Sequence, residues 1–221
     1  MRRTYTVAVA TALLALVLPA TAPATLTEVG LLGATTPATV PSCPGTPCLA
    51  VSRTTGYQAR VGAVMHPLTV PKPGSVVAWT ITLGKPSATQ IKFFNTNEGG
   101  ASEAGIAILR PVKKPNLSYK LIAQSPTVKL EPYFGKSAQF PLETTIPVRK
   151  NDVVALTVPT WAPALALGFP SETSWRASRP RSACTSTSAQ TAHTTIGSAV
   201  QYYCLYQTAR LTYSATLIST P

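Results

Sequence analysis

The sequence is short of acidic side chains. Seven Asp and Glu stand against 19 Lys and Arg among 221 residues, which gives a formal net charge of +12. A net positive field favours anionic partners such as acidic cell-wall polymers, lipid headgroups or nucleic acid. The charge does not choose among these partners, and it also suits a protein whose charge only prevents self-association.

Histidine and aspartate are scarcer still, which leaves little material for acid–base catalysis. His66 and His193 are the only imidazoles, and Asp152 is the only aspartate. A nucleophilic triad needs a base and an orienting acid. Asp152 stands in a turn that leads into a strand, where Asp commonly bonds nearby backbone N–H groups. Neither a G-x-S-x-G motif nor a glycine-rich phosphate loop occurs, so no catalytic constellation is evident.

Long apolar runs are absent beyond the N-terminus. Arg2 and Arg3 precede an apolar run at 7–18 and small residues at 19–24, which is the order of a secretory signal peptide. The run is shorter than the ~20 residues that cross a bilayer, which argues against an uncleaved membrane anchor. Cleavage after Ala24 would remove two cations and lower the net charge to +10. We expect a secreted or cell-envelope protein with one folded domain.

Four cysteines are present, and an even number in an exported chain indicates disulfides rather than metal or redox chemistry. Four cysteines allow three pairings. We expect Cys43–Cys48, because the turn pair Pro44-Gly45 can fold this short segment back on itself. We expect Cys184–Cys204 around a Ser/Thr-rich loop, where a bridge would remove entropy from the unfolded chain.

The chain beyond the leader reads as a linker followed by many short strands. Residues 25–42 are biased to Ala, Thr and Pro, so we expect a linker there and a domain over 43–221. Period-two or continuous apolar runs predict strands at 77–83, 91–93, 106–109, 119–122, 153–158 and 211–217. Pro and Gly turns separate them. The pattern predicts an all-β, antiparallel β-sandwich of jelly-roll type, with a closed barrel as the alternative.

The segment 95–103 is rich in oxygen ligands. Asn97, Glu98 and Glu103 lie near Gly99-Gly100, and carboxylates and amides on a glycine-kinked loop can coordinate calcium. The spacing is not that of an EF-hand, and a solvated loop between strands is the alternative. Glu98 and Glu103 are also candidate acids for a glycosidase, although catalytic pairs usually stand on rigid elements. We expect no other cofactor.

Aromatic and arginine side chains suggest a binding surface. Trp161 stands between prolines, and Trp175 precedes three arginines, Arg176, Arg179 and Arg181. Rings on loops can stack on sugar faces or bases, and Arg can hold anionic groups. The alternative is that both tryptophans cap the sandwich core. Tyr202, Tyr203 and Tyr206 cluster around Cys204, whereas Trp79 lies on the inward face of a strand and is expected in the core.

The stretches 76–86 with 90–95, 150–163 and 175–180 together resemble a group of uncharacterised exported proteins of GC-rich actinobacteria. The resemblance covers most of the chain beyond Cys43. It implies export and the extent of the domain, and it transfers no activity to any residue.

Together these features favour a non-catalytic module of the cell exterior or envelope. It would bind a cell-wall glycan or another anionic polymer or surface through loop aromatics and arginines. The alternatives are a secreted polysaccharide hydrolase and a structural envelope protein with no small ligand.

Overall fold

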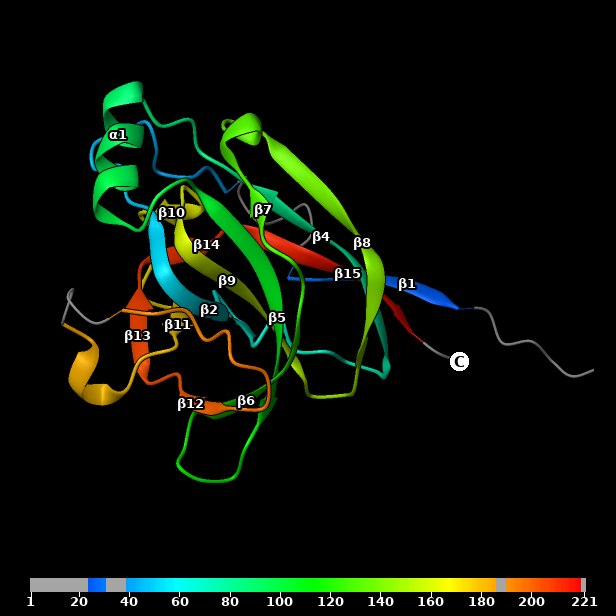
Figure 1. The fold of residues 1–221 in the computed structure, drawn as a ribbon. Helices are drawn as coiled ribbons and strands as arrows, with labels where there is room; N and C mark the ends of the chain where they lie inside the picture. Colours follow the sequence, from blue (N-terminus) through cyan, green and yellow to red (C-terminus); the bar gives the residue numbers. More distant parts are fainter. Residues whose placement is uncertain (1–23, 31–38, 186–189, 220–221) are drawn as a thin grey trace, which may run out of the picture.

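The computed structural model describes residues 24–30, 39–185 and 190–219. The predicted signal peptide therefore lies outside the described residues, except for Ala24. Two antiparallel sheets pack face to face (Figure 1). This confirms the predicted all-β antiparallel sandwich.

The smaller sheet has the strand order β1-β15-β4-β8, and the larger sheet runs β12-β6-β5-β9-β2-β11-β13. The strands of the smaller sheet are β1 (Thr25–Val29), β4 (Gly74–Thr82), β8 (Ser137–Val148) and β15 (Tyr213–Ser219). The larger sheet contains β2 (Val51–Val61), β5 (Glu103–Pro111), β6 (Ser118–Gln124), β9 (Val153–Ala162), β11 (Ser174–Ala177), β12 (Ala199–Gln201) and β13 (Cys204–Gln207). Three shorter pieces attach to these strands. They are β3 (Val64–Met65) beside β2, β7 (Val128–Lys129) beside β5, and a ribbon of β10 (Leu165–Leu167) with β14 (Ala209–Leu211).

The core lies between the two sheets and is built from the predicted apolar runs. Residues 153–158 are all buried in β9, which has β5 on one side and β2 on the other. This confirms the expectation of a central strand. Trp79 of β4 is 1% exposed and faces the core, also as expected. Burial on this scale is the main stabilising term of such a sandwich.

Residues 25–29, expected to belong to a linker, form β1 instead. They pair with β15 from Thr25↔Ser219 to Val29↔Ala215. The carboxylate of Glu28 accepts hydrogen bonds from the hydroxyls of Ser214 and Thr216. Thr-Leu-Thr-Glu-Val alternates like an edge strand, but its Thr content resembled that of the low-complexity segment that follows.

The strand expected at 91–93 is wrong, because this segment lies in the helix α1 (Ala88–Asn97). Ser87 and Gln90 form a capping box: the Ser87 hydroxyl accepts from the Gln90 backbone N–H, and the Gln90 amide oxygen accepts from the Ser87 N–H. These two bonds satisfy donors that a helix start leaves unpaired. The buried Phe94 then faces the sheet, whereas Phe93 is 58% exposed.

Both predicted disulfides are confirmed. Cys43 pairs with Cys48, and Cys184 pairs with Cys204, which leaves no free cysteine. The second bridge joins β13 to the 3-10 helix η2 (Arg181–Ala183), and a further 3-10 turn, η1 (Glu131–Tyr133), precedes β8. Within the described ranges, no helix is long and apolar enough to cross a membrane.

Candidate functional site

Trp161 is not a surface ring. It belongs to β9 and is fully buried, stacked on Phe94 of α1 at a centroid distance of 4.7 Å. Its indole Nε1 donates to Asn95 Oδ1 at 2.8 Å and to the Gly100 carbonyl at 3.0 Å. The hypothesis that Trp161 stacks on a ligand is therefore wrong, because the ring is buried and its face is covered by Phe94. The ring fastens α1 and the following turn to the sheet.

Trp175 is likewise covered, in β11, with 6% of its surface exposed. Tyr206 of the neighbouring strand stacks on it at 4.7 Å, so this phenol occupies the ring face that a sugar would need. Trp175 therefore cannot act as the expected stacking platform. Its indole Nε1 is buried and has no hydrogen-bond partner among the described residues.

The three arginines that follow Trp175 contact Tyr203 and Tyr206. Arg176 donates to the Tyr203 carbonyl at 2.8 Å, and Arg179 donates to the Tyr206 hydroxyl at 2.6 Å. Burial lowers the pKa of Arg179. Arg181 is exposed, and its guanidinium carbon lies 5.6 Å from the centroid of the Tyr203 ring. Of the three arginines, Arg181 is the one that reaches solvent most fully.

The oxygen-rich segment does not assemble a metal site. Asn97 and Glu98 stand at the end of α1, where Asn97 Nδ2 donates to the Phe93 carbonyl and Glu98 accepts from Arg53 Nε at 3.1 Å. Glu103 begins β5 and accepts a hydrogen bond from Thr127. The carboxylates are thus engaged by different neighbours, which removes support from both the calcium and the glycosidase hypotheses. In the described parts of the chain no three His, Cys, Asp or Glu side chains are grouped to hold a metal.

A concentration of positive charge lies at the end of the sandwich opposite α1. Arg110 of β5 stands directly opposite Lys120 of β6 in the antiparallel ladder. Like charges at such a position repel. The turn that joins these two strands adds Lys113 and Lys114, both exposed. Figure 1 shows this turn and the turn between β8 and β9 at the same end of the molecule.

Asp152 ties these two turns together. Arg110 donates two hydrogen bonds of 2.8 Å to the Asp152 carboxylate, from Nε to Oδ1 and from Nη2 to Oδ2. This pairing raises the pKa of Arg110. The Arg149 backbone N–H also donates to Asp152 Oδ2, as the sequence predicted for an Asp in this turn. Asp152 is 1% exposed, so its negative charge is buried and is balanced by Arg110 rather than presented to solvent. Arg149 and Lys150 remain exposed beside it.

The arginine cluster borders this region. The Tyr202 N–H donates to the carbonyl of Leu117 in the β5–β6 turn, and the Tyr203 N–H donates to the carbonyl of Arg179. We call the combined surface the basic end. The segment before Lys72 joins it, because the Val70 backbone pairs with Asn151 and Asp152 of the β8–β9 turn. The cations of the basic end are Lys72, Arg110, Lys113, Lys114, Lys120, Arg149, Lys150, Arg179 and Arg181.

Sequence reasoning found two of these nine cations, Arg179 and Arg181, and missed the rest. The pairs Lys113-Lys114 and Arg149-Lys150 were visible as turn residues, but they are far apart in the chain. The register Leu109↔Val153 between β5 and β9 brings the two turns to one end. A long-range strand pairing of this kind cannot be read from local patterning.

His193 serves the structure of the neighbouring loop. It is buried, with Nδ1 3.0 Å from the Tyr202 hydroxyl and Nε2 2.9 Å from Ser198 Oγ. Ser198 Oγ also donates to the Thr195 carbonyl at 2.7 Å. The serine proton is therefore used there, and Nε2 acts as the donor to Ser198. Burial lowers the pKa of His193, so the ring is held neutral.

No family model, curated protein or solved structure matches this chain.

Proposed function

We propose that this protein is a non-catalytic module that binds an extended anionic glycan through the basic end. The observation that carries the proposal is the cross-strand pair Arg110 and Lys120, continued by the exposed Lys113 and Lys114. Clustered like charges destabilise a fold unless something offsets the repulsion. Asp152 offsets it at Arg110, and an anionic polymer would offset it at the exposed lysines.

The charge balance of the basic end leaves its lysines available. Asp152 is the one acid in the segments that form the basic end, and its carboxylate already accepts hydrogen bonds from Arg110 and from a backbone N–H. Neither Lys113, Lys114 nor Lys150 makes a salt bridge to another described residue. Their charges therefore project a positive field into solvent, where it would attract a polymer and raise its rate of association.

The aromatic contribution to glycan binding would come from tyrosine rather than tryptophan. Tyr203 is partly exposed and carries Arg181 over its ring, and it follows Tyr202, whose backbone N–H bonds to Leu117 in the β5–β6 turn. An aromatic face beside a guanidinium suits a sugar that bears carboxylate, sulfate or phosphate groups. This combination favours an acidic glycan over a bare polyphosphate.

An extracellular or envelope location fits the chemistry. Disulfides persist in oxidising compartments, and two are present here. Acidic glycans are abundant at the cell exterior, where such a module would meet them.

The test is binding to immobilised polygalacturonate, dextran sulfate and neutral dextran. We expect the protein to bind the two anionic polymers and not neutral dextran. A double variant, Lys113→Glu with Lys114→Glu, should weaken binding at least about tenfold, since each change replaces an attraction with a repulsion. The matched control is Lys85→Glu with Lys92→Glu, two exposed lysines outside the basic end.

The control has the same net charge, so it separates a local site from a general charge effect. An equal loss in both double variants would overturn the assignment of the basic end. Tighter binding to duplex DNA than to either acidic glycan would overturn the glycan part of the proposal.

A further inference from the structure

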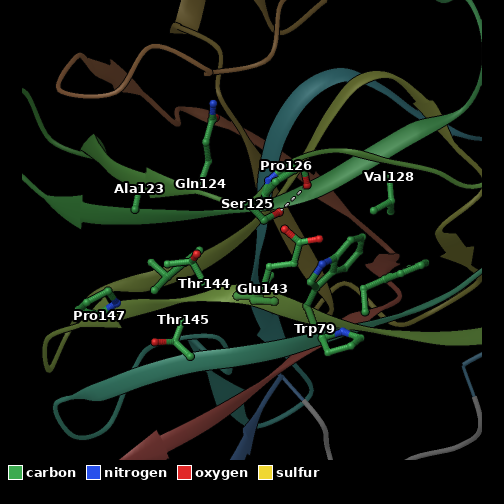
Figure 2. A pocket seen from close by; sticks show the side chains of 14 residues that line it. Trp79, Ala123, Gln124, Ser125, Pro126, Val128, Glu143, Thr144, Thr145 and Pro147 are labelled. Atoms are coloured by element: carbon green, nitrogen blue, oxygen red, sulfur yellow. Dashed lines mark hydrogen bonds between the residues drawn. The ribbon is translucent and has the colours of Figure 1, made fainter.

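A second feature lies on the side of the sandwich, where the two sheets part. A groove of about 430 Å³ opens between the edge strand β8 and the β6–β7 segment (Figure 2). Its walls come from Trp79 of β4, residues 123–126, Val128 of β7 and residues 140–147 of β8. This volume is within the range of small-molecule pockets, and the lining is mainly apolar.

The groove exists because β8 leaves the ladder. Ala78 of β4 pairs with Pro141, but Val76 pairs with Ile146. The four residues 142–145 of β8 therefore stand against a single residue of β4. Such a bulge redirects side chains and often occurs near binding sites. Here it turns Glu143 toward the groove, where Figure 2 shows its carboxylate beside the Trp79 ring and below Ser125.

Besides the buried Gln124 amide oxygen, two polar groups of the groove lining have no hydrogen-bond partner among the described residues. Glu143 makes neither a salt bridge nor a hydrogen bond with any described residue. The Trp79 indole N–H, in the groove wall, is also without a hydrogen bond to the described chain. An unpaired donor and an unpaired carboxylate thus face the same apolar space.

We infer that the groove binds a small apolar molecule that carries an amino group with an oxygen on a neighbouring carbon. Glu143 would pair with the ammonium, and the Trp79 N–H would donate to the oxygen. The apolar body would lie against Phe140, Leu142 and Val128. Anionic ligands are excluded from this position, because they would meet an unpaired carboxylate on desolvation.

The chain carries +12 overall, yet the groove presents a carboxylate with no cation in its lining. Several described acids form no salt bridge, but Glu143 is the one of them that lines the groove. The isolation of Glu143 next to apolar walls is the charge complementarity that selects an amine. The inference does not depend on the glycan proposal, because the groove and the basic end share no residue.

The test is isothermal titration of the full chain with phenylalaninol, which has an aromatic body, an amine and an adjacent hydroxyl. N-acetyl-phenylalaninol keeps the body and the hydroxyl but loses the positive charge. We expect phenylalaninol to bind and the acetylated compound to bind at least about tenfold more weakly, since bonds to charged groups are worth more than neutral ones.

Glu143→Gln should bring the two compounds to equal affinity by weakening phenylalaninol alone. Glu143 is exposed on an edge strand, so this variant keeps the fold, which near-UV circular dichroism checks. Glu172→Gln, at another exposed glutamate, should change neither affinity. The inference is wrong if neither compound binds, if both bind the wild type equally, or if Glu143→Gln leaves the difference intact.

Discussion

Arg110 and Lys120 face each other across the β5–β6 ladder, and Arg110 also binds the carboxylate of Asp152 through two hydrogen bonds. Lys120 is therefore left with a cation opposite it and an exposed, uncompensated charge. An interaction that disfavours the fold and concentrates positive charge on a surface is typical of a functional compromise.

The first prediction concerns this pair. Lys120→Glu should stabilise the fold by about 0.2–1 kcal/mol while weakening binding to acidic glycans, because it replaces a repulsive cross-strand contact. Lys129 provides the control, since its cross-strand partner is Glu103. Lys129→Glu should lower the free energy of unfolding by a similar amount. Urea denaturation measures both changes, and stability shifts of the same sign would contradict the electrostatic explanation.

The second prediction compares the two buried tryptophans. Trp161→Phe removes an indole that donates to Asn95 and Gly100, whereas Trp175→Phe removes an indole N–H that has no partner. Both changes leave a cavity, but only the first leaves acceptors unsatisfied. We expect Trp161→Phe to cost about 1–2 kcal/mol more.

Hydrogen exchange provides the local readout for this comparison. Trp161→Phe should speed exchange of the α1 amides, and Trp175→Phe should not, because α1 contacts only the first of these rings. Equal destabilisation with unchanged exchange in α1 would show that Trp161 does not anchor the helix.

The third prediction concerns pH. Burial lowers the pKa of His193 below its ordinary value of 6.5. The unfolded chain then binds more protons than the native state below that pH, so the stabilising contribution is present above it and is lost as the pH falls. We expect the free energy of unfolding to decline between about pH 7 and pH 5.

The substitution His193→Gln should flatten this decline, because the amide does not titrate in that range. The exposed His66 is the control position, and His66→Gln should leave the decline as it is. If the pH dependence survives in the His193 variant, another group is responsible for it.

The fourth prediction concerns the disulfides. The bridge Cys184–Cys204 spans 20 residues and Cys43–Cys48 spans five. Loop-closure entropy predicts costs of ~3 and ~2 kcal/mol for their respective removal by paired Cys→Ser changes. Thermal and urea unfolding would measure both. The larger loop also carries His193 and supports η2, so a smaller effect there than at Cys43–Cys48 would contradict the entropic account.

Much of the fold could be predicted from the sequence, because strand periodicity is a local property. Residues 153–158 form the expected central strand, and the pairing Cys43–Cys48 follows from the turn residues Pro44 and Gly45. The helix was missed although its capping box, Ser87 and Gln90, is visible in the sequence. There the alternation of Ile91 and Phe93 was given more weight than the start signal.

The candidate site was harder to predict, since it depends on register and burial. Pro159 and Pro163 gave the segment around Trp161 the look of a loop, but β9 continues through Pro159 at the point where its register with β2 shifts. A proline is tolerated at such an irregularity. The strand pairing then buries Trp161, and the same set of pairings assembles the cations of the basic end.

The measurement that tests the central claim most directly is the salt dependence of binding to an acidic glycan. On linear polyanions, each lysine contact releases condensed counterions, and on nucleic acids it steepens the slope of log K against log salt by about 0.7–0.9. We predict that replacing Lys113 and Lys114 by Ala will make the wild-type slope shallower by one to two such increments, whereas replacing Lys85 and Lys92 will leave it unchanged. A slope that is the same in the wild type and in both variants would show that the basic end does not contact the polymer.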